Sequence, residues 1–248
     1  MAARFRLLDL DEECIKTVLK CFDGFDLISF SLCSKKRLTN VCSLKLHKKE
    51  LRIACGTVFY AQLVFKRHLM RLYFCEDGYD RRLDEWDDRS RRLQVDYIEG
   101  CYPYENLYRQ DPYQEPTIRR WRKANFQGND WLRHLMDVFN CVKISSMHVQ
   151  ESKFDIDSVV DIVQNLNIVS FTTFPNVTKQ HTLSWLQAQP CLENLIVDSL
   201  TFDDPSEFSI FLRNQKSLIV QGEAKVALDK VLTVNSLSFN CSPGNGQN

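Results

Sequence analysis

The chain has 248 residues, of which 44% are hydrophobic and 26% are charged, as is ordinary for a folded protein. Its 32 basic and 32 acidic residues cancel, so no overall charge draws it toward nucleic acid or an anionic membrane. Eight glycines leave little material for a glycine-rich phosphate loop. The length allows one large domain, or a small module followed by a larger one.

The N-terminal residues lack the continuous apolar stretch of a signal peptide, because Arg6, Asp9 and Asp11 interrupt them. The longest nearly apolar run, residues 53–65, is 13 residues long, too short to span a bilayer. We therefore expect a soluble protein of the cytoplasm, the nucleus or both, without a membrane segment.

The ten cysteines occur singly, without a Cys-x-x-Cys pair, and the five histidines are not spaced with them as zinc ligands would be. In an intracellular chain, we expect most of these thiols to be reduced and partly buried. The sequence predicts no metal site and no cofactor.

The first residues form an apolar hook, consisting of Phe5, Leu7, Leu8 and Leu10. In a partner's groove, each such side chain would contribute roughly 1.5–3 kcal/mol before the cost of association. Asp11 is placed to cap a helix that ends near residues 23–24, where glycine can adopt the left-handed conformation. The apolar stripe of this helix has helical spacing and consists of Ile15, Val18, Leu19 and Phe22.

Asp26 is then a candidate cap for a second, nearly all-apolar helix over Leu27–Leu32. A third helix is expected to turn Leu38, Val41 and Leu44 inward, with basic residues on its outer side. Three short helices in about 40 residues bury little surface by themselves, so we expect them to pack on a partner or on the rest of the chain.

This N-terminal segment resembles an F-box. The resemblance rests on Phe-x-Leu-Leu-x-Leu, an acidic helix start, Ile-x-x-x-Leu, Asp-Leu and Ser-x-x-Ser-Lys. In this chain these are Phe5, Leu7, Leu8 and Leu10; Glu12 and Glu13; Ile15 and Leu19; Asp26 and Leu27; and Ser31, Ser34 and Lys35. It covers residues 4–45. One departure is Asp11, which stands where the family usually has proline. Aspartate can cap the same turn, so we expect the fold to persist with weaker adaptor affinity.

The resemblance implies a Skp-family adaptor as partner. The residues that it assigns to adaptor binding are Phe5, Leu7, Leu8, Leu10, Ile15, Leu19, Asp26 and Leu27.

The middle of the chain, residues 46–109, is predicted to connect two domains. Residues 44–74 are rich in β-branched and aromatic residues and predict two or three strands. Residues 76–92 mix acidic residues with arginines, which favours a solvated loop or exposed helix over a metal or hydrolase site. Residues 102–116 are turn-rich.

Four basic residues surround Trp121, namely Arg119, Arg120, Arg122 and Lys123. Such a cluster can bind nucleic acid or an acidic peptide. In a chain without net charge, such a cluster is more often the solvent-exposed face of a helix. We therefore do not expect a nucleic-acid partner.

From residue 129 onward the pattern changes. A helical stripe (Trp131, Leu132, Leu135, Met136 and Phe139) precedes five short apolar segments. Their leading residues are Val142, Val169, Leu195, Leu218 and Leu237, at intervals of 27, 26, 23 and 19 residues, with helical stretches around 156–166 and 182–187 between them. These intervals match a degenerate leucine-rich-repeat-like solenoid of strands and helices.

The segment DVFNCVKISSM and the repeats behind it look like the F-box-associated domain (type 2) of the large nematode F-box family. This resemblance covers residues 110–240, and residues 241–248 are expected to be a disordered tail. The predicted fold class is α+β or α/β: a three-helix F-box, then a leucine-rich-repeat-like solenoid.

No catalytic motif is found, so we expect a non-enzyme. The resemblance implies the substrate-recognition subunit of an SCF-type (Skp–cullin–F-box) ubiquitin ligase. It would link the adaptor, and through it a cullin, to an unidentified target protein. The alternative is a repeat scaffold without a ligase role, and Asp11 in the usual proline position keeps this alternative open.

Overall fold

The structure is a computed structural model that describes residues 10–46, 50–65, 69–77, 91–102, 118–150, 152, 154–174, 177, 179–188, 192–198, 217–221 and 237–240. The first part of the predicted hook (Phe5, Leu7 and Leu8), most of the segments at 76–92 and 102–116, and the predicted tail lie outside these residues.

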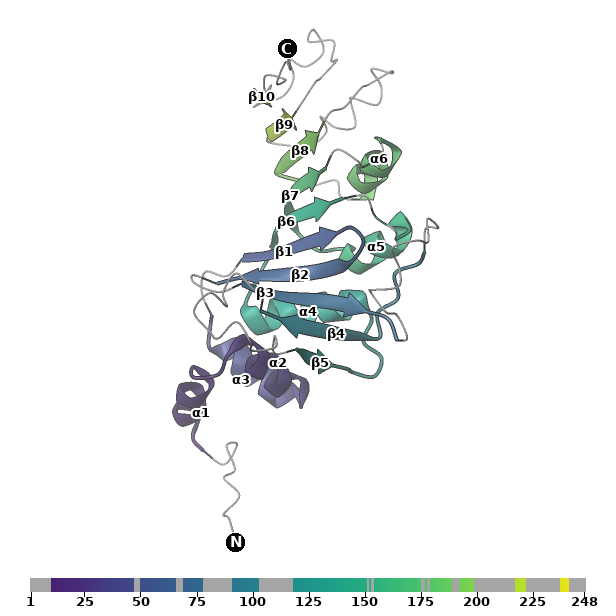
Figure 1. Cartoon of the computed structure of the whole chain (residues 1–248). Coiled ribbons are helices and arrows are strands. Elements are labelled where there is room, and N and C mark those ends of the chain that lie inside the picture. Colours follow the sequence, from purple (N-terminus) through teal and green to yellow (C-terminus); the bar gives the residue numbers. More distant parts are fainter. Residues whose placement is uncertain are drawn as a thin grey trace, which may run out of the picture.

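Three helices precede a large sheet with further helices packed on it (Figure 1). The helices are α1 (Glu12–Leu19), α2 (Gly24–Leu32), α3 (Lys35–Ser43), α4 (Gly128–Phe139), α5 (Ile156–Val163) and α6 (Lys179–Ala188). The strands are β1 (Glu50–Cys55), β2 (Phe59–Val64), β3 (Leu69–Cys75), β4 (Tyr97–Cys101), β5 (Arg119–Trp121), β6 (Ile144–Val149), β7 (Ile168–Thr173), β8 (Asn194–Asp198), β9 (Ser217–Gln221) and β10 (Leu237–Asn240).

The described strands form one sheet in the order β10-β9-β8-β7-β6-β1-β2-β3-β4-β5. Strands β1 to β5 are an antiparallel meander, whereas β6 to β10 are parallel to one another. The two halves join where β6 pairs in parallel with β1. The sheet therefore runs through both the predicted connecting region and the predicted repeat region.

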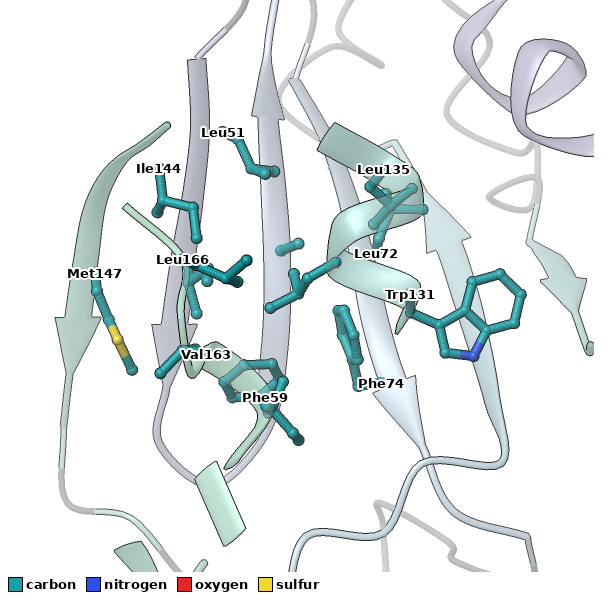
Figure 2. Close-up of a cluster of buried hydrophobic side chains, with 14 of the residues drawn as sticks. Leu51, Phe59, Leu72, Phe74, Trp131, Leu135, Ile144, Met147, Val163 and Leu166 are labelled. Carbon is teal, nitrogen blue, oxygen red and sulfur yellow. The ribbon is translucent and has the colours of Figure 1, made fainter. Parts of the chain in front are cut away.

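The core lies between the sheet and the helices. Strand residues alternate between buried and partly exposed, as in β2, because successive side chains point to opposite faces. On the buried face, Leu72 and Phe74 of β3 meet Trp131 and Leu135 of α4 (Figure 2). The predicted stripe of α4 is confirmed, since all of its members except the half-buried Met136 are fully buried.

Two predicted helix boundaries are wrong. Helix α1 ends at Leu19 instead of near residues 23–24. Helix α2 begins at Gly24 instead of Leu27, because Asp23 caps it by accepting a hydrogen bond from the backbone N–H of Asp26 at 2.7 Å. Asp26 therefore lies in the first turn, and Gly24 is helical.

Two further predictions need correction. The Arg119–Trp121 segment is strand β5 and not a helix face, because it pairs with β4. Val142, taken as the start of the first apolar segment, is 82% exposed and precedes β6, whose first residue is Ile144.

The mixed α+β class and the three N-terminal helices are confirmed. The two or three strands predicted over residues 44–74 are β1, β2 and β3, the last of which ends at Cys75. Strands and helices alternate from β6 to β8, with α5 and α6 between them, and strands β6 to β10 are parallel. Their assignment to a leucine-rich-repeat-like solenoid stays a prediction. None of the helices in the described part of the chain combines the length and apolar character needed to cross a membrane.

Candidate adaptor-binding module and its junction with the sheet

Each of the three N-terminal helices has its own cap. The Asp11 carboxylate accepts a hydrogen bond from the backbone N–H of Cys14 at 2.8 Å, and this bond lowers the pKa of Asp11. Ser34 caps α3 by accepting from the N–H of Arg37 at 3.2 Å. The predicted role of Asp11 as a cap is confirmed, so a residue other than proline starts α1 here.

Three of the predicted adaptor-binding residues are buried inside the chain. Ile15, Leu19 and Leu27 are 5%, 0% and 3% exposed, and they belong to the main hydrophobic core. In this conformation they hold the helices together. Leu10, the one described hook residue, is partly buried against the same core. An adaptor contact by any of these residues stays a prediction.

A half-buried aromatic pair lies on α2 and the turn before it. The rings of Phe22 and Phe30 meet edge to face, with centroids 6.0 Å apart, and the Arg37 guanidinium lies 5.3 Å from the centre of the Phe30 ring. Sequence reasoning assigned Phe22 to the inner stripe and did not consider Phe30.

Helix α2 is fixed to strand β5 by two polar contacts. The Asp26 carboxylate lies 2.5 Å from an Arg119 guanidinium nitrogen. The Trp121 indole N–H donates to Ser29 Oγ at 2.8 Å. Phe25 packs between these partners, with its ring centroid 5.6 Å from that of Trp121. Asp26, predicted to bind the adaptor, thus makes an ion pair within the chain.

Helix α4 contacts both α2 and α3. Ser31 Oγ and His134 Nε2 are 2.9 Å apart, and both side chains are buried. Burial, together with the charge of Lys123, lowers the pKa of His134 to about 4. The imidazole is therefore neutral at pH 7. The thiol of Cys42 donates to the Asp137 carbonyl at 3.3 Å, which ties α3 to the same helix.

These contacts connect the N-terminal helices to strand β5 of the sheet and to helix α4. Sequence reasoning did not find them, because their partners lie more than 90 positions apart in the chain. A helix pattern predicts which face is buried but not which distant element covers it.

The basic cluster around Trp121 is largely neutralised. Arg119 pairs with Asp26, Arg120 with Glu99, and Arg122 with Asp77. The ammonium group of Lys123 lies 4.3 Å from the centre of the Phe126 ring. Three of the four cations are thus already matched by carboxylates, which leaves little charge here for a phosphate backbone.

The described residues contain no group of three potential metal ligands. Eight cysteines in this part of the chain are free thiols. A cleft of about 460 Å³ lies between the segment Arg92–Asp96, the start of α4, and α5. Its charged lining residues are Arg92, Asp96 and Asp161, and neither a histidine nor a cysteine lines it. Its lining therefore lacks a nucleophile–base pair of the histidine or cysteine type.

Comparison with protein-family models identifies an F-box domain at residues 7–48, close to the predicted span of 4–45. No curated protein and no solved structure matches the chain. F-box proteins are in general non-catalytic subunits that bind Skp-type adaptors within SCF ubiquitin ligases. The N-terminal helices α1 to α3 of this chain therefore lie within an F-box domain.

Proposed function

We propose that this chain is the substrate-recognition subunit of an SCF-type ubiquitin ligase. The observation that carries the proposal is the F-box domain at residues 7–48. Its hook and helices would bind a Skp-family adaptor and, through it, a cullin. The sheet behind it would hold a target protein in the cytoplasm or the nucleus.

The chain would contribute proximity and no bond chemistry. Holding a target near a charged conjugating enzyme raises the effective concentration of its lysines. The junction supports this role, because α2 and α4 are connected by buried contacts and not by a free linker. A target bound to the sheet would be held in a defined orientation relative to the adaptor.

The sheet is the candidate target-binding part. We propose that residues 110–240 form the F-box-associated domain (type 2) of the nematode family, with a leucine-rich-repeat-like arrangement. The parallel strands β6 to β10 support this assignment.

Co-expression of the full chain with a Skp-family adaptor tests the proposal. We expect a complex that survives size-exclusion chromatography. The double change Leu7→Ala and Leu8→Ala should weaken it at least a hundredfold, because two apolar side chains lose contacts worth several kcal/mol. The control is Val142→Ala, which shortens an 82% exposed side chain directly before β6.

The second candidate is a scaffold without a ligase role. It is favoured by one observation, namely that Asp11, and not proline, starts α1. A folded chain that ignores the adaptor would support this candidate. An adaptor complex that the Leu7 and Leu8 changes leave intact would show that the hook is not the contact.

A further inference from the structure

All of the described helices that pack on the sheet lie on one of its faces. Helices α4 and α5 cover the buried side chains of β1, β2, β3 and β6 (Figure 2). Helix α2 joins them on this face, since Phe25 packs against Gly100 of β4 and Trp121 of β5. The opposite face, which we call the open face, is turned toward the viewer in Figure 1.

The strand register arranges the side chains of the open face in two rows. One row carries polar groups and consists of Arg71, Gln62, Arg52, Ser146, Ser170 and Asn194. The other consists of Glu99, Tyr73, Tyr60, Ala54, His148, Thr172 and Ile196. Except for the buried Glu99, these residues are half-buried, as expected for a sheet surface without a helix over it.

Arg120, which lies opposite Glu99 in the register of β4 and β5, is also on this face. Two of the three arginines that the structure describes on the face already have a carboxylate partner. Arg52 pairs with Glu50 at 2.6 Å, and Arg120 pairs with Glu99 at 2.7 Å. Arg71, on β3, has no ion pair within the described part of the chain. Its guanidinium lies 5.5 Å from the centre of the Tyr60 ring, and its Nε is buried without a hydrogen-bond partner.

Among the described residues, this arrangement leaves Arg71 as the arginine of the face without a carboxylate partner. A guanidinium presents its donors in a planar fork that fits a carboxylate. Because Nε is buried, an incoming carboxylate would meet the terminal nitrogens of this half-buried side chain. The neighbouring Gln62 amide and the Tyr60 ring add a hydrogen-bonding group and an apolar surface beside that fork.

We propose that the open face binds an acidic segment of the target protein, with Arg71 receiving an aspartate or glutamate side chain. The inference rests on the proposed function, because it names the target chemistry of the same subunit. A peptide fits better than a nucleic acid, because phosphate-backbone binding uses several unpaired cations and the arginines around Trp121 are already paired.

The test uses the full chain in complex with its adaptor and an array of immobilised 12-residue peptides. Each peptide with Asp or Glu at alternate positions has a counterpart with Asn or Gln. We expect acidic peptides to bind, and Arg71→Gln to weaken binding about tenfold, the loss typical of one charge-assisted hydrogen bond. Arg71→Lys keeps the charge but loses the planar fork, so it should bind acidic peptides less tightly than the parent and more tightly than Arg71→Gln.

The matched control is Arg133→Gln, which removes an exposed cation from α4 on the helix-covered side. Thermal unfolding of each variant separates a folding defect from a binding defect. The inference is overturned if acidic and amide peptides bind equally, if the two glutamine variants behave alike, or if a 12-nucleotide single-stranded DNA binds more tightly than every peptide.

Adaptor binding by the same variants separates the two proposals. Adaptor binding together with failed acidic-peptide binding overturns this inference and leaves the proposed function standing. Peptide binding by a chain that ignores the adaptor overturns the ligase role and supports the open face as a docking surface.

Discussion

Gly100 lies at the point where the F-box domain meets the sheet, and replacing it by alanine should loosen that junction. A Cβ atom at this position would be 2.7 Å from Phe25 Cε1 and 2.8 Å from Trp121 Cζ3. Normal contacts between carbon atoms are about 3.5–4.0 Å, so both rings would have to move. Neither moves easily, because Phe25 is 1% exposed and the Trp121 indole is hydrogen-bonded to Ser29.

Overpacking of this kind destabilises the folded state by about 1–3 kcal/mol. Alanine also lowers the conformational entropy of the unfolded chain, which stabilises the folded state by about 0.4–1 kcal/mol. With the middle of each range, we expect Gly100→Ala to lower the free energy of unfolding by about 1 kcal/mol, or the Tm by roughly 2–4 °C. Urea unfolding followed by circular dichroism and tryptophan fluorescence measures this change.

Gly24→Ala is the matched control at the same junction. Its Cβ would lie 3.2 Å from the flexible end of Met70, and alanine favours a helix, so we expect no loss of stability. Equal stability of Gly100→Ala and the parent would refute the packing argument, as would an equal loss in the two variants.

Three further outcomes are expected. Trp121→Phe removes the hydrogen bond to Ser29 and should cost about 1 kcal/mol in urea unfolding; an unchanged midpoint would show that the bond contributes nothing. The pKa of His134 is lowered in the folded state from 6.5 to about 4. The stability that the neutral imidazole contributes is therefore complete above pH 6.5 and is lost as the pH falls toward 4. His134→Gln should therefore have a flatter stability profile than the parent in that window, and parallel profiles would contradict this assignment. Iodoacetamide should alkylate exposed Cys21 well before Cys55, whose thiol pKa burial raises to about 11; peptide mass spectrometry that finds equal rates would contradict the burial of Cys55.

The sequence predicted the elements with strong local periodicity. Helix α4 was recognised because its apolar residues recur with helical spacing over 12 residues. The cap of α1 was recognised because Asp11 stands directly before an acidic first turn. In both cases the signal lies within the element itself.

The errors arose where neighbouring residues offered equivalent choices. Asp23 and Asp26 can each cap a helix, and in the structure Asp23 is the cap while Asp26 pairs with Arg119. The three residues of β5 are too few for a strand alternation, and their charges resemble those of an exposed helix. Pairing with β4 decides the strand, and no local pattern contains that information.

The candidate site could be predicted only in part. The F-box segment was found from its motif, but the contacts of Ser29 with Trp121 and of Ser31 with His134 depend on elements that follow much later in the chain. The absence of a carboxylate partner for Arg71 among the described residues could not be predicted, because it depends on which carboxylates the register brings to each arginine.

The contact between Ser31 and His134 spans 103 positions of the chain, which has a consequence for synthesis on the ribosome. At 5–20 residues per second, the F-box helices emerge roughly 5–20 s before the helix that completes their packing. During that interval the apolar side of α2 has no intrachain cover from β5 or α4. A chaperone, or the adaptor itself, would therefore be able to bind the nascent F-box domain before β5 and α4 have been synthesised.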